Sequence, residues 1–341
     1  MEVWGRSPTP LGDPAFTADG RLVVSHHPAF RTDARVSVFT AADALAPYPG
    51  SAWNDGGGAD AFDSPQGLRT DAQGVMWIAD LGSRGDVVPR IVAWDTRNDR
   101  LHRVIELPRP ATHDHSEPQD LMVDLQRGRL YIADEGAGRG GDGSRAALIV
   151  VDLASGDAWR VLEREPCIRP ADVDIVVDRR VLQVFDEAKG TSRPVRVGVD
   201  GVAMDARGEW FYFGALNGGA VYRVRCDDLA DRARSADLSS RVERYAERPN
   251  AGGMWMDGAD DLYLVEIEAR AVGVIASSDR RYRRVAHHPD MLWPDGLVGG
   301  PDGWIYVTAS ELPLSPQFNA GRMTAEPPHR VFRFRPPGAP A

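Results

Sequence analysis

The chain has 341 residues, of which 43% are hydrophobic, and a formal net charge of −10 at pH 7. This acidic balance comes without any basic stripe, so nucleic acid and anionic membrane surfaces are excluded as expected partners. No segment approaches the ~20 consecutive apolar residues that would span a bilayer.

The N-terminal segment MEVWGRSP lacks the apolar run of a signal peptide, so we expect a cytoplasmic protein. The two cysteines, Cys167 and Cys226, lie far apart in the sequence. In a reducing compartment two free thiols are the expected state, and a disulfide between them is the alternative. We expect a monomer.

One pattern recurs along the chain. A hydrophobic run leads into an Asp-Gly-type turn, and a second hydrophobic run, rich in aromatic and β-branched residues, follows. The clear copies are PQGLRTDAQGVMWIAD (Pro65–Asp80), PQDLMVDLQRGRLYIAD (Pro118–Asp134), VDGVAMDARGEWFYFGA (Val199–Ala215), GGMWMDGADDLYLVE (Gly252–Glu266) and PDGLVGGPDGWIYVTA (Pro294–Ala309), and a weaker copy begins at Pro14. Aligned copies start at Pro14, Gln66, Gln119, Asp200, Gly252 and Asp295, so three of the five intervals are 52 or 53 residues. A repeat of this length, built from short strands, predicts a β-propeller.

Each copy reads as a β-hairpin. In the turn, Asp bonds its own backbone and Gly supplies a positive φ, while the second run suits a buried pleated surface. Two further strands follow in most units, and the N-terminal residues Glu2–Trp4 supply the missing strand of the last one. The prediction is an all-β, six-bladed β-propeller of four-stranded blades, closed by the N-terminal segment and forming a single domain over residues 1–341.

Three segments depart from the repeat. The interval between Gln119 and Asp200 is 81 residues long and holds an extra strand pair at about 172–186, which we interpret as an insertion because it lacks the aromatic second run. The stretch Asp227–Arg241 predicts one short helix. The loop at 311–328 is long and irregular, as lids often are.

The succession of these blades is similar to the major royal jelly protein and yellow protein family. The phrases that carry the resemblance are VDGVAMDARGEWFYFGALNGGAVYRV, AGGMWMDGADDLYLVE, LWPDGLVGGPDGWIYVTAS followed by HRVFRF, and GRLYIADEGA with ALIVVDLASGDAWRV. The resemblance covers residues 60–335, in a bacterial version, and places the chain among the wider six-bladed, gluconolactonase-like propellers. It implies a funnel-shaped ligand site on one face of the ring. Some members are associated with dopachrome conversion, and others only bind small amines.

Propeller geometry sorts residues by face. Loops that enter the first strand of a blade, and loops that leave its second strand, surround the same mouth of the central channel. The residues expected to contact a ligand there are His26, Gln66, Asp80, Gln119, Asp120, Asp134, Asn217, Glu266, His287, Asp295, Phe318 and Asn319.

The loop before the third blade places two imidazoles beside a carboxylate-rich entry. We therefore predict His113 and His115 as the proton-transfer pair, with Glu135 or Asp200 orienting them. Asp200 and Asp295 occupy equivalent entry positions, and oxygen ligands of this kind suit Ca²⁺ or another divalent metal. The alternative is a transition-metal site formed by His113 and His115 together with Glu117. In gluconolactonase-like relatives Asn is expected where this chain has Asp200, which weakens a lactonase assignment.

Two function classes remain. The first is a small-molecule enzyme that uses general acid–base chemistry on a ring-containing metabolite, as a tautomerase or isomerase, or in a cyclisation or lactone-type reaction. The second is a binding protein for a small amine or aromatic ligand without turnover; a protein-interaction platform is the least favoured. No organic cofactor is expected, because the sequence holds no dinucleotide fingerprint, and the glycine-rich stretch Gly136–Gly143 lacks the features of a phosphate loop.

Overall fold

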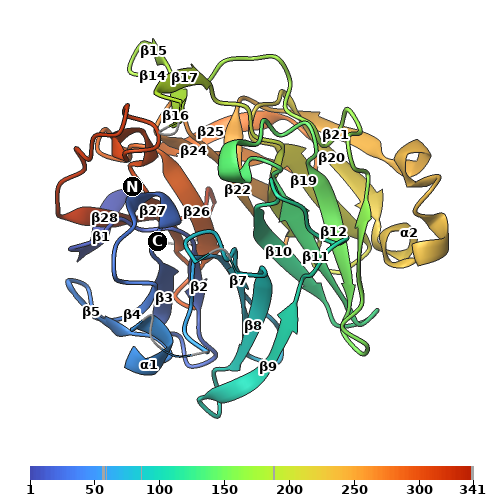
Figure 1. Ribbon diagram of the computed structural model, residues 1–341, viewed down its shortest axis with the longest axis horizontal. Helices are drawn as coiled ribbons and strands as arrows, with labels where there is room; N and C mark the ends of the chain where they lie inside the picture. The colour runs from blue at the N-terminus through green and yellow to red at the C-terminus, as the bar shows by residue number, and fades with distance from the viewer. Residues whose placement is uncertain (56–57, 59, 86, 187–188, 339–341) are drawn as a thin grey trace.

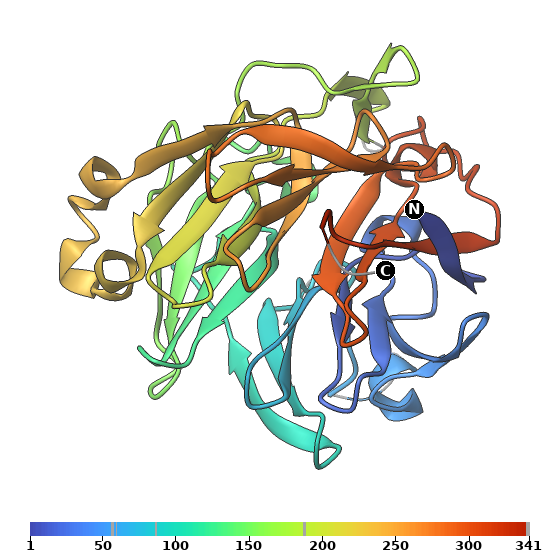
Figure 2. The same ribbon diagram turned by 180° about the vertical axis from the view of Figure 1, so that it is seen from behind.

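The computed structural model describes residues 1–338 except 56–57, 59, 86 and 187–188. Six four-stranded antiparallel sheets are arranged as blades around a central axis (Figures 1 and 2). The predicted six-bladed propeller is therefore confirmed. In the last blade the N-terminal strand is the outermost one and pairs with the last strand of the chain, so the ring is closed by the two ends of the sequence. No helix in the described ranges is long and apolar enough to cross a membrane.

Blades follow the chain in order. The strands of the first three blades are β2 (Pro14–Phe16), β3 (Leu22–Ser25), β4 (Val36–Ala41), β5 (Ala44–Pro47); β6 (Pro65–Thr70), β7 (Val75–Asp80), β8 (Arg90–Asp95), β9 (Arg100–Glu106); and β10 (Pro118–Asp124), β11 (Arg129–Asp134), β12 (Ala147–Asp152), β13 (Ala158–Val161). Those of the last three are β18 (Val199–Met204), β19 (Trp210–Ala215), β20 (Ala220–Arg225), β21 (Glu243–Glu247); β22 (Ala251–Met256), β23 (Leu262–Glu266), β24 (Ala271–Ile275), β25 (Tyr282–His287); and β26 (Pro294–Gly299), β27 (Ile305–Ala309), β28 (His329–Phe334), β1 (Glu2–Ser7).

The aromatic second runs fill the spaces between blades. Phe211 and Phe213 of β19 are fully buried, and the ring of Phe211 lies 5.3 Å from that of Tyr131 in the preceding blade. The turn aspartates of the repeat have the predicted local role: Asp71 Oδ1 accepts the Gln73 N–H at 2.9 Å, and Asp205 Oδ1 accepts the Glu209 N–H at 2.7 Å.

Two of the irregular segments differ from the sequence-based expectation. The insertion forms two hairpins in place of one pair, β14 (Val176–Val177) with β15 (Arg180–Val181), and β16 (Gln183–Asp186) with β17 (Thr191–Pro194). Asp178 and Arg179 turn with positive φ and close the first hairpin early. The stretch Asp227–Arg241 is not one helix.

Short helical turns replace that helix. The residue Asp231 ends the first turn with an extended backbone and caps the next by accepting the Ala233 N–H, which divides the segment. The helical elements of the chain are α1 (Ser51–Asn54) and α2 (Cys226–Ala230), with the 3-10 turns η1 (Pro28–Phe30), η2 (Gly138–Gly140), η3 (Arg232–Arg234), η4 (Leu238–Arg241) and η5 (Leu312–Leu314).

The innermost strands share one irregularity that shapes the central channel. In five blades the pairing of the first and second strands jumps at the same place, so that two residues oppose one, as in a β-bulge. The paired residues of these bulges are Gln66–Gly67, Gln119–Asp120, Asp200–Gly201, Gly252–Gly253 and Asp295–Gly296. The first member of each pair is the entry position of the sequence repeat.

Glycine at the second bulge position lets neighbouring blades approach closely. A Cβ added at Gly67 would lie 1.9 Å from the carbonyl oxygen of Gln119, and one at Gly253 would lie 2.6 Å from that of Asp295. These contacts are with backbone, which cannot rotate away as a side chain could. The centre of the ring therefore tolerates no side chain at these positions.

We predict that Gly67→Ala lowers the free energy of unfolding by about 1–3 kcal/mol or more, because the new methyl group overpacks the space between two blades. Gly258→Ala is the matched control, since nothing lies within 4 Å of its added Cβ and its φ is not positive. The control should change stability by about 0.5 kcal/mol or less. Urea unfolding of both variants measures the difference, and equal stability of the two would contradict this account of the ring.

Candidate functional site

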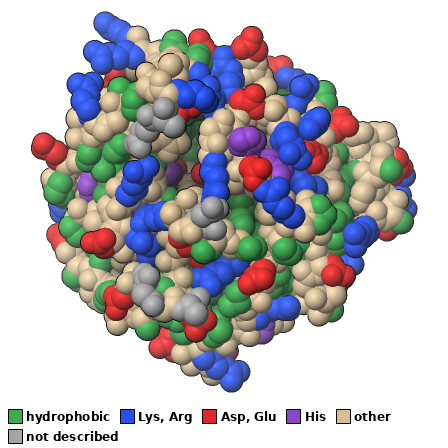
Figure 3. Space-filling view, in the orientation of Figure 1, with side chains coloured by type: hydrophobic (Ala, Val, Ile, Leu, Met, Phe, Trp, Pro, Cys, Tyr) green, Lys and Arg blue, Asp and Glu red, His purple; other side chains and the backbone are tan. Residues whose placement is uncertain are grey.

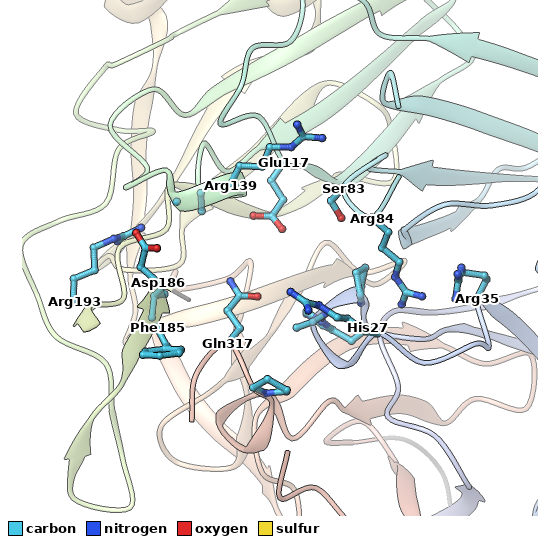
Figure 4. Close-up of a pocket in the computed structure, with 18 residues that line it drawn as sticks. His27, Arg35, Ser83, Arg84, Glu117, Arg139, Phe185, Asp186, Arg193 and Gln317 are labelled. Carbon is cyan, nitrogen blue, oxygen red and sulfur yellow. The ribbon is translucent and has the colours of Figure 1, made fainter. Parts of the chain in front are cut away.

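Two cavities meet at one mouth of the ring. The outer cavity, here called the vestibule, has a volume of about 820 Å³, and the inner cavity, here called the floor, has about 60 Å³. They share the lining residues His27, Glu117, Ala137, Val184, Arg193 and Gln317, so they form one funnel. Basic side chains are prominent on this face of the molecule (Figure 3), and Figure 4 shows how the polar residues of the vestibule face each other.

The β-bulges position the polar side chains of the floor. Gln66, Gln119, Asp200 and Asp295, each the first residue of its bulge, all line this cavity. A bulge turns the side chain of the extra residue out of the regular alternation. Because the bulge occurs at the same level in successive blades, four side chains from four blades meet at the axis.

Two glutamates and two aspartates make the floor acidic. Burial is the main cause that raises the pKa of Glu117 to about 7, with the charge of Asp134 adding to it, and burial raises the pKa of Asp295 to about 7. The pKa values of Glu135 and Asp200 are raised well above their ordinary range, first by burial and then by neighbouring carboxylates. All four carboxyl groups therefore hold their protons to a higher pH than exposed carboxyl groups do.

Deeper in the channel, the next carboxyl groups are partly neutralised. Asp13 is buried, and desolvation together with Asp120 and Asp295 raises its pKa well above the ordinary value. Asp120 fills the bulge position that is glycine elsewhere, and its carboxylate accepts hydrogen bonds from Arg69 at 2.9 Å and from the Val202 N–H at 3.1 Å. Asp120 therefore links three blades and does not line the vestibule or the floor.

The floor also has apolar walls. Trp293 and Phe318 line it, with ring centroids 6.4 Å apart, and Phe318 comes from the long loop at 311–328. The same loop contributes Pro316 and Gln317 to the vestibule. The loop at 311–328 therefore borders both cavities of the funnel. These two rings give the floor an apolar side opposite its carboxyl groups.

Several residues expected at the mouth are instead committed to fixing the loops that enter their own blades. Asp80 accepts the Ser64 N–H at 2.6 Å and pairs with Arg90; Asp134 accepts the Glu117 N–H and the Ser116 hydroxyl, each at 2.7 Å. Asn217 accepts the Val197 N–H at 2.8 Å. The imidazole of His26 lies 2.8 Å from the Thr9 hydroxyl and 2.9 Å from that of Ser37. None of these four side chains lines the vestibule or the floor.

The structure also places other expected contact residues away from the funnel. Glu266 pairs with Arg284 at 2.7 Å and accepts the Tyr282 hydroxyl. His287 ends the outermost strand of its blade and is exposed. Asn319 donates to Arg322 and Thr324 within its own loop. Short-range partners, which the sequence pattern does not report, decide these orientations.

The predicted pair His113 and His115 lies beside the funnel and not on its lining. The ring centroids are 6.3 Å apart. His113 is within 3.3 Å of the Arg160 guanidinium, which in turn binds Asp134 at 2.5 Å. Burial and the charge of Arg160 lower the pKa of His113, and His115 is exposed. The histidine pair is thus linked to Glu117 only indirectly: Asp134 binds Arg160 beside His113 and also accepts the Glu117 N–H. The catalytic role of the pair remains a prediction.

Other funnel residues were not among the expected contacts. His27 lines both cavities, directly after the expected His26, and Gln66 Nε2 lies 3.3 Å from its Nε2. Burial and the charge of Arg84 lower the pKa of His27 to about 3, so it is neutral. Arg84 lies in the loop after β7 and Arg193 in β17 of the insertion, and both are outside the repeated hairpin, where no periodicity indicates a position. Glu117 precedes its entry position by two residues and was predicted only as part of the alternative metal site.

Two floor oxygens suit a hard cation. Gln119 Oε1 and Asp295 Oδ2 are buried and have no hydrogen-bond partner in the described part of the chain. Carboxylate and amide oxygens are the ligands that Ca²⁺ prefers, and Asp200, the other predicted ligand, lines the same cavity. Within the described residues, no group of three or more His, Cys, Asp or Glu side chains is already gathered as a metal site.

Comparison with known proteins agrees with this geometry. The family model of the major royal jelly protein matches residues 63–315. The chain belongs to the major royal jelly protein family. A search of curated proteins found no match for this family member.

Solved structures that are similar to this major royal jelly protein family member show the same fold. A luciferin-regenerating enzyme is 12% identical with a TM-score of 0.59, and the alignment covers 98% of this chain and 93% of that one. A gluconolactonase from Xanthomonas campestris is 13% identical with a TM-score of 0.57, covering 91% and 86%. A streptogramin B lyase is 12% identical with a TM-score of 0.51, covering 92% and 97%.

The raised carboxyl pKa values predict how stability depends on pH. In the folded protein the buried carboxyl groups keep protons that the same groups lose in the unfolded chain. The free energy of unfolding should therefore fall as pH rises from about 4 through 7. The lowered pKa values of His26 and His27 act in the opposite direction below about pH 6.5. Asp295→Asn removes one of these carboxyl groups, so the free energy of unfolding should fall less steeply between pH 5 and 8 in this variant. Thermal unfolding across this range tests the expectation, and parallel pH profiles of the two proteins would refute it.

Proposed function

We propose that the protein is a small-molecule enzyme that works by general acid–base chemistry at the floor of the funnel. One observation carries the proposal: Glu117, Glu135, Asp200 and Asp295 line one small cavity, and burial raises the pKa of each, in two cases to about 7. Carboxyl groups with pKa values near the working pH can both give and take protons.

The arrangement supports proton transfer between two positions of one bound molecule. A protonated carboxyl such as Glu135 donates to one atom of the substrate, while an ionised neighbour removes a proton from another. Trp293 and Phe318 hold a ring in place and exclude water. Such a division of roles suits a tautomerase or isomerase, or a cyclisation. With water as the nucleophile, an ionised carboxyl as general base gives a lactone-opening reaction instead.

The names of the structural neighbours help to choose the first assay. Two are described as a gluconolactonase and a putative gluconolactonase, and one as a lyase. We therefore propose δ-gluconolactone and related lactones as first substrates, followed by cyclic compounds that tautomerise. Activity should depend on an ionisation near pH 7, where Glu117 and Asp295 titrate.

Turnover and affinity separate the proposed roles. Glu135→Gln and Asp200→Asn should lower the rate by roughly 10²–10⁴-fold, which is typical of a lost acid–base group, and leave affinity within a few-fold. His113→Ala and His115→Ala test the sequence-based prediction in the same assay. If the histidine variants lose turnover while the carboxyl variants keep it, the acid–base role belongs to the histidine pair and this proposal falls.

The alternative function is binding without turnover. The acidic floor favours a small amine, or an aromatic ligand packed against Trp293 and Phe318. This reading predicts saturable binding with no product at any pH from about 5 to 9. Glu135→Gln would then weaken the binding of an amine and change no rate.

A second feature of the floor supports a divalent cation. Gln119, Asp200 and Asp295 would hold it, and a bound Ca²⁺ would polarise a substrate oxygen. We predict that Ca²⁺ raises the melting temperature by mass action, since only the folded protein binds it, and that Asp200→Asn abolishes the rise. Asp290→Asn, at an exposed position, is the control. A melting temperature that responds neither to Ca²⁺ nor to chelation would remove the metal from the proposal.

A further inference from the structure

Two guanidinium groups meet on one wall of the vestibule. Arg84 Nη1 donates to the carbonyl oxygen of Thr32 at 2.6 Å, and Arg35 Nη1 donates to the same oxygen at 2.5 Å. Figure 4 shows both side chains on the side of the cavity that His27 occupies. One backbone carbonyl thus brings two positive charges together, although like charges repel.

Three nitrogen atoms of this arginine pair lack a hydrogen-bond partner in the described part of the chain. Arg84 Nε and Nη2 and Arg35 Nε are shielded from solvent and have no hydrogen-bond partner among the described residues. A buried donor without a partner costs about 1–3 kcal/mol, and more when it is charged. Buried polar groups are normally bonded, so such a set of donors indicates a missing acceptor.

Among the residues that the structure describes, the nearby acidic side chains do not supply that acceptor. The Asp63 carboxylate accepts the backbone N–H groups of Arg84 and Gly85 and the Ser64 hydroxyl. Asp33 bonds Arg35 only through its backbone oxygen. Burial, with Arg35 next in importance, lowers the pKa of Arg84 to about 10, so Arg84 keeps its charge at neutral pH. The neutral state of His27 is consistent with a positive environment.

We propose that Arg84 and Arg35 form a subsite for an anionic group, a carboxylate or a phosphate, of the ligand that enters the funnel. The planar guanidinium with its parallel N–H donors matches both groups. The subsite lies in the vestibule, and the vestibule leads to the floor through shared lining residues. The anionic end of the ligand stays in the outer part while its other end reaches the carboxyl groups.

This arrangement defines a class of ligand. The wall at Arg84 is basic and the floor is acidic, so the funnel selects a molecule with an anionic group at one end and a neutral or cationic polar group at the other. Small organic acids with a ring, and amino-acid derivatives, have this form. As a statement about substrates the inference rests on the proposed function, but anion binding itself can be measured without turnover.

The experiment compares matched probes by calorimetric titration of the whole protein. Benzoate carries a carboxylate on a ring, benzamide is its neutral counterpart, and inorganic phosphate is the second anion. We expect saturable binding of benzoate and none of comparable strength for benzamide. Tighter binding of phosphate than of benzoate would assign the subsite to phosphate esters, and the reverse to carboxylates. Equal binding of benzoate and benzamide would overturn the proposal.

Variants locate the subsite. Arg84→Gln should weaken benzoate or phosphate binding by roughly tenfold or more, as the loss of a charge-assisted donor predicts. Arg84→Lys keeps the charge without the planar fork and should show an intermediate loss. Arg100→Gln, whose side chain is 73% exposed on an outer strand, removes the same charge far from the funnel and should change nothing. If Arg84→Gln fails to fold, Arg35→Gln takes its place.

The outcomes separate this inference from the proposed function. Anion binding without turnover of any substrate tested would contradict the proposed enzyme function and support the anion subsite. The opposite outcome has two parts: Arg84→Gln turns over a neutral lactone at an unchanged KM, and the native protein shows no detectable anion binding. This outcome would contradict the anion subsite and support the enzyme function.

Discussion

The close approach of the innermost strands is the constraint on which the rest of the structure depends. Glycines at the second bulge position let the backbone of one blade contact the next, where any Cβ would overlap it. The narrow axis that results brings the first bulge residues of four blades into one small cavity. A wider ring would leave the same side chains as separate groups in water, with ordinary pKa values. The chemistry of the floor is therefore a consequence of backbone packing.

Crowding acidic groups at a dry axis works against folding, since burial and mutual repulsion both disfavour their charged forms. The protein tolerates this because the surrounding loops are fixed independently. Asp80 and Asp134, each bonded to the loop that enters its blade, anchor the floor residues from behind. Their own charges are balanced by Arg90 and Arg160. The crowded carboxyl groups at the axis are thus surrounded by ion pairs one layer outward, which fix the loops that carry them.

How much the sequence predicted follows from which residues belong to the repeat. Gln66, Gln119, Asp200 and Asp295 occupy one repeated position, so their convergence could be predicted from alignment of the copies. Asp80, Asp134 and Asn217, at the ends of the second strands of their blades, lie at the same height in the ring. Their side chains do not point into the funnel, because they bond the loops that enter their own blades. Arg84 and Arg193 lie outside the repeat, and no periodicity indicates where such residues go. The insertion was predicted as one strand pair at about 172–186, and the structure has two short hairpins there because Asp178 and Arg179 turn after only two paired residues.

This division between repeated and non-repeated residues also separates two roles within the funnel. Gln66, Gln119, Asp200 and Asp295 of the floor fill one repeated bulge position, so the ring geometry brings them together, and Glu117 and Glu135 add two carboxyl groups from the loops at the ends of β10 and β11. The vestibule is built from loops, which can vary without disturbing the blades. Arg84 and Arg35 belong to that variable part, as does Phe318 of the long final loop. Under the proposed function, changes in the loops would alter the ligand while the reactive centre stays the same: the vestibule would select the ligand, and the floor would carry out the proton chemistry.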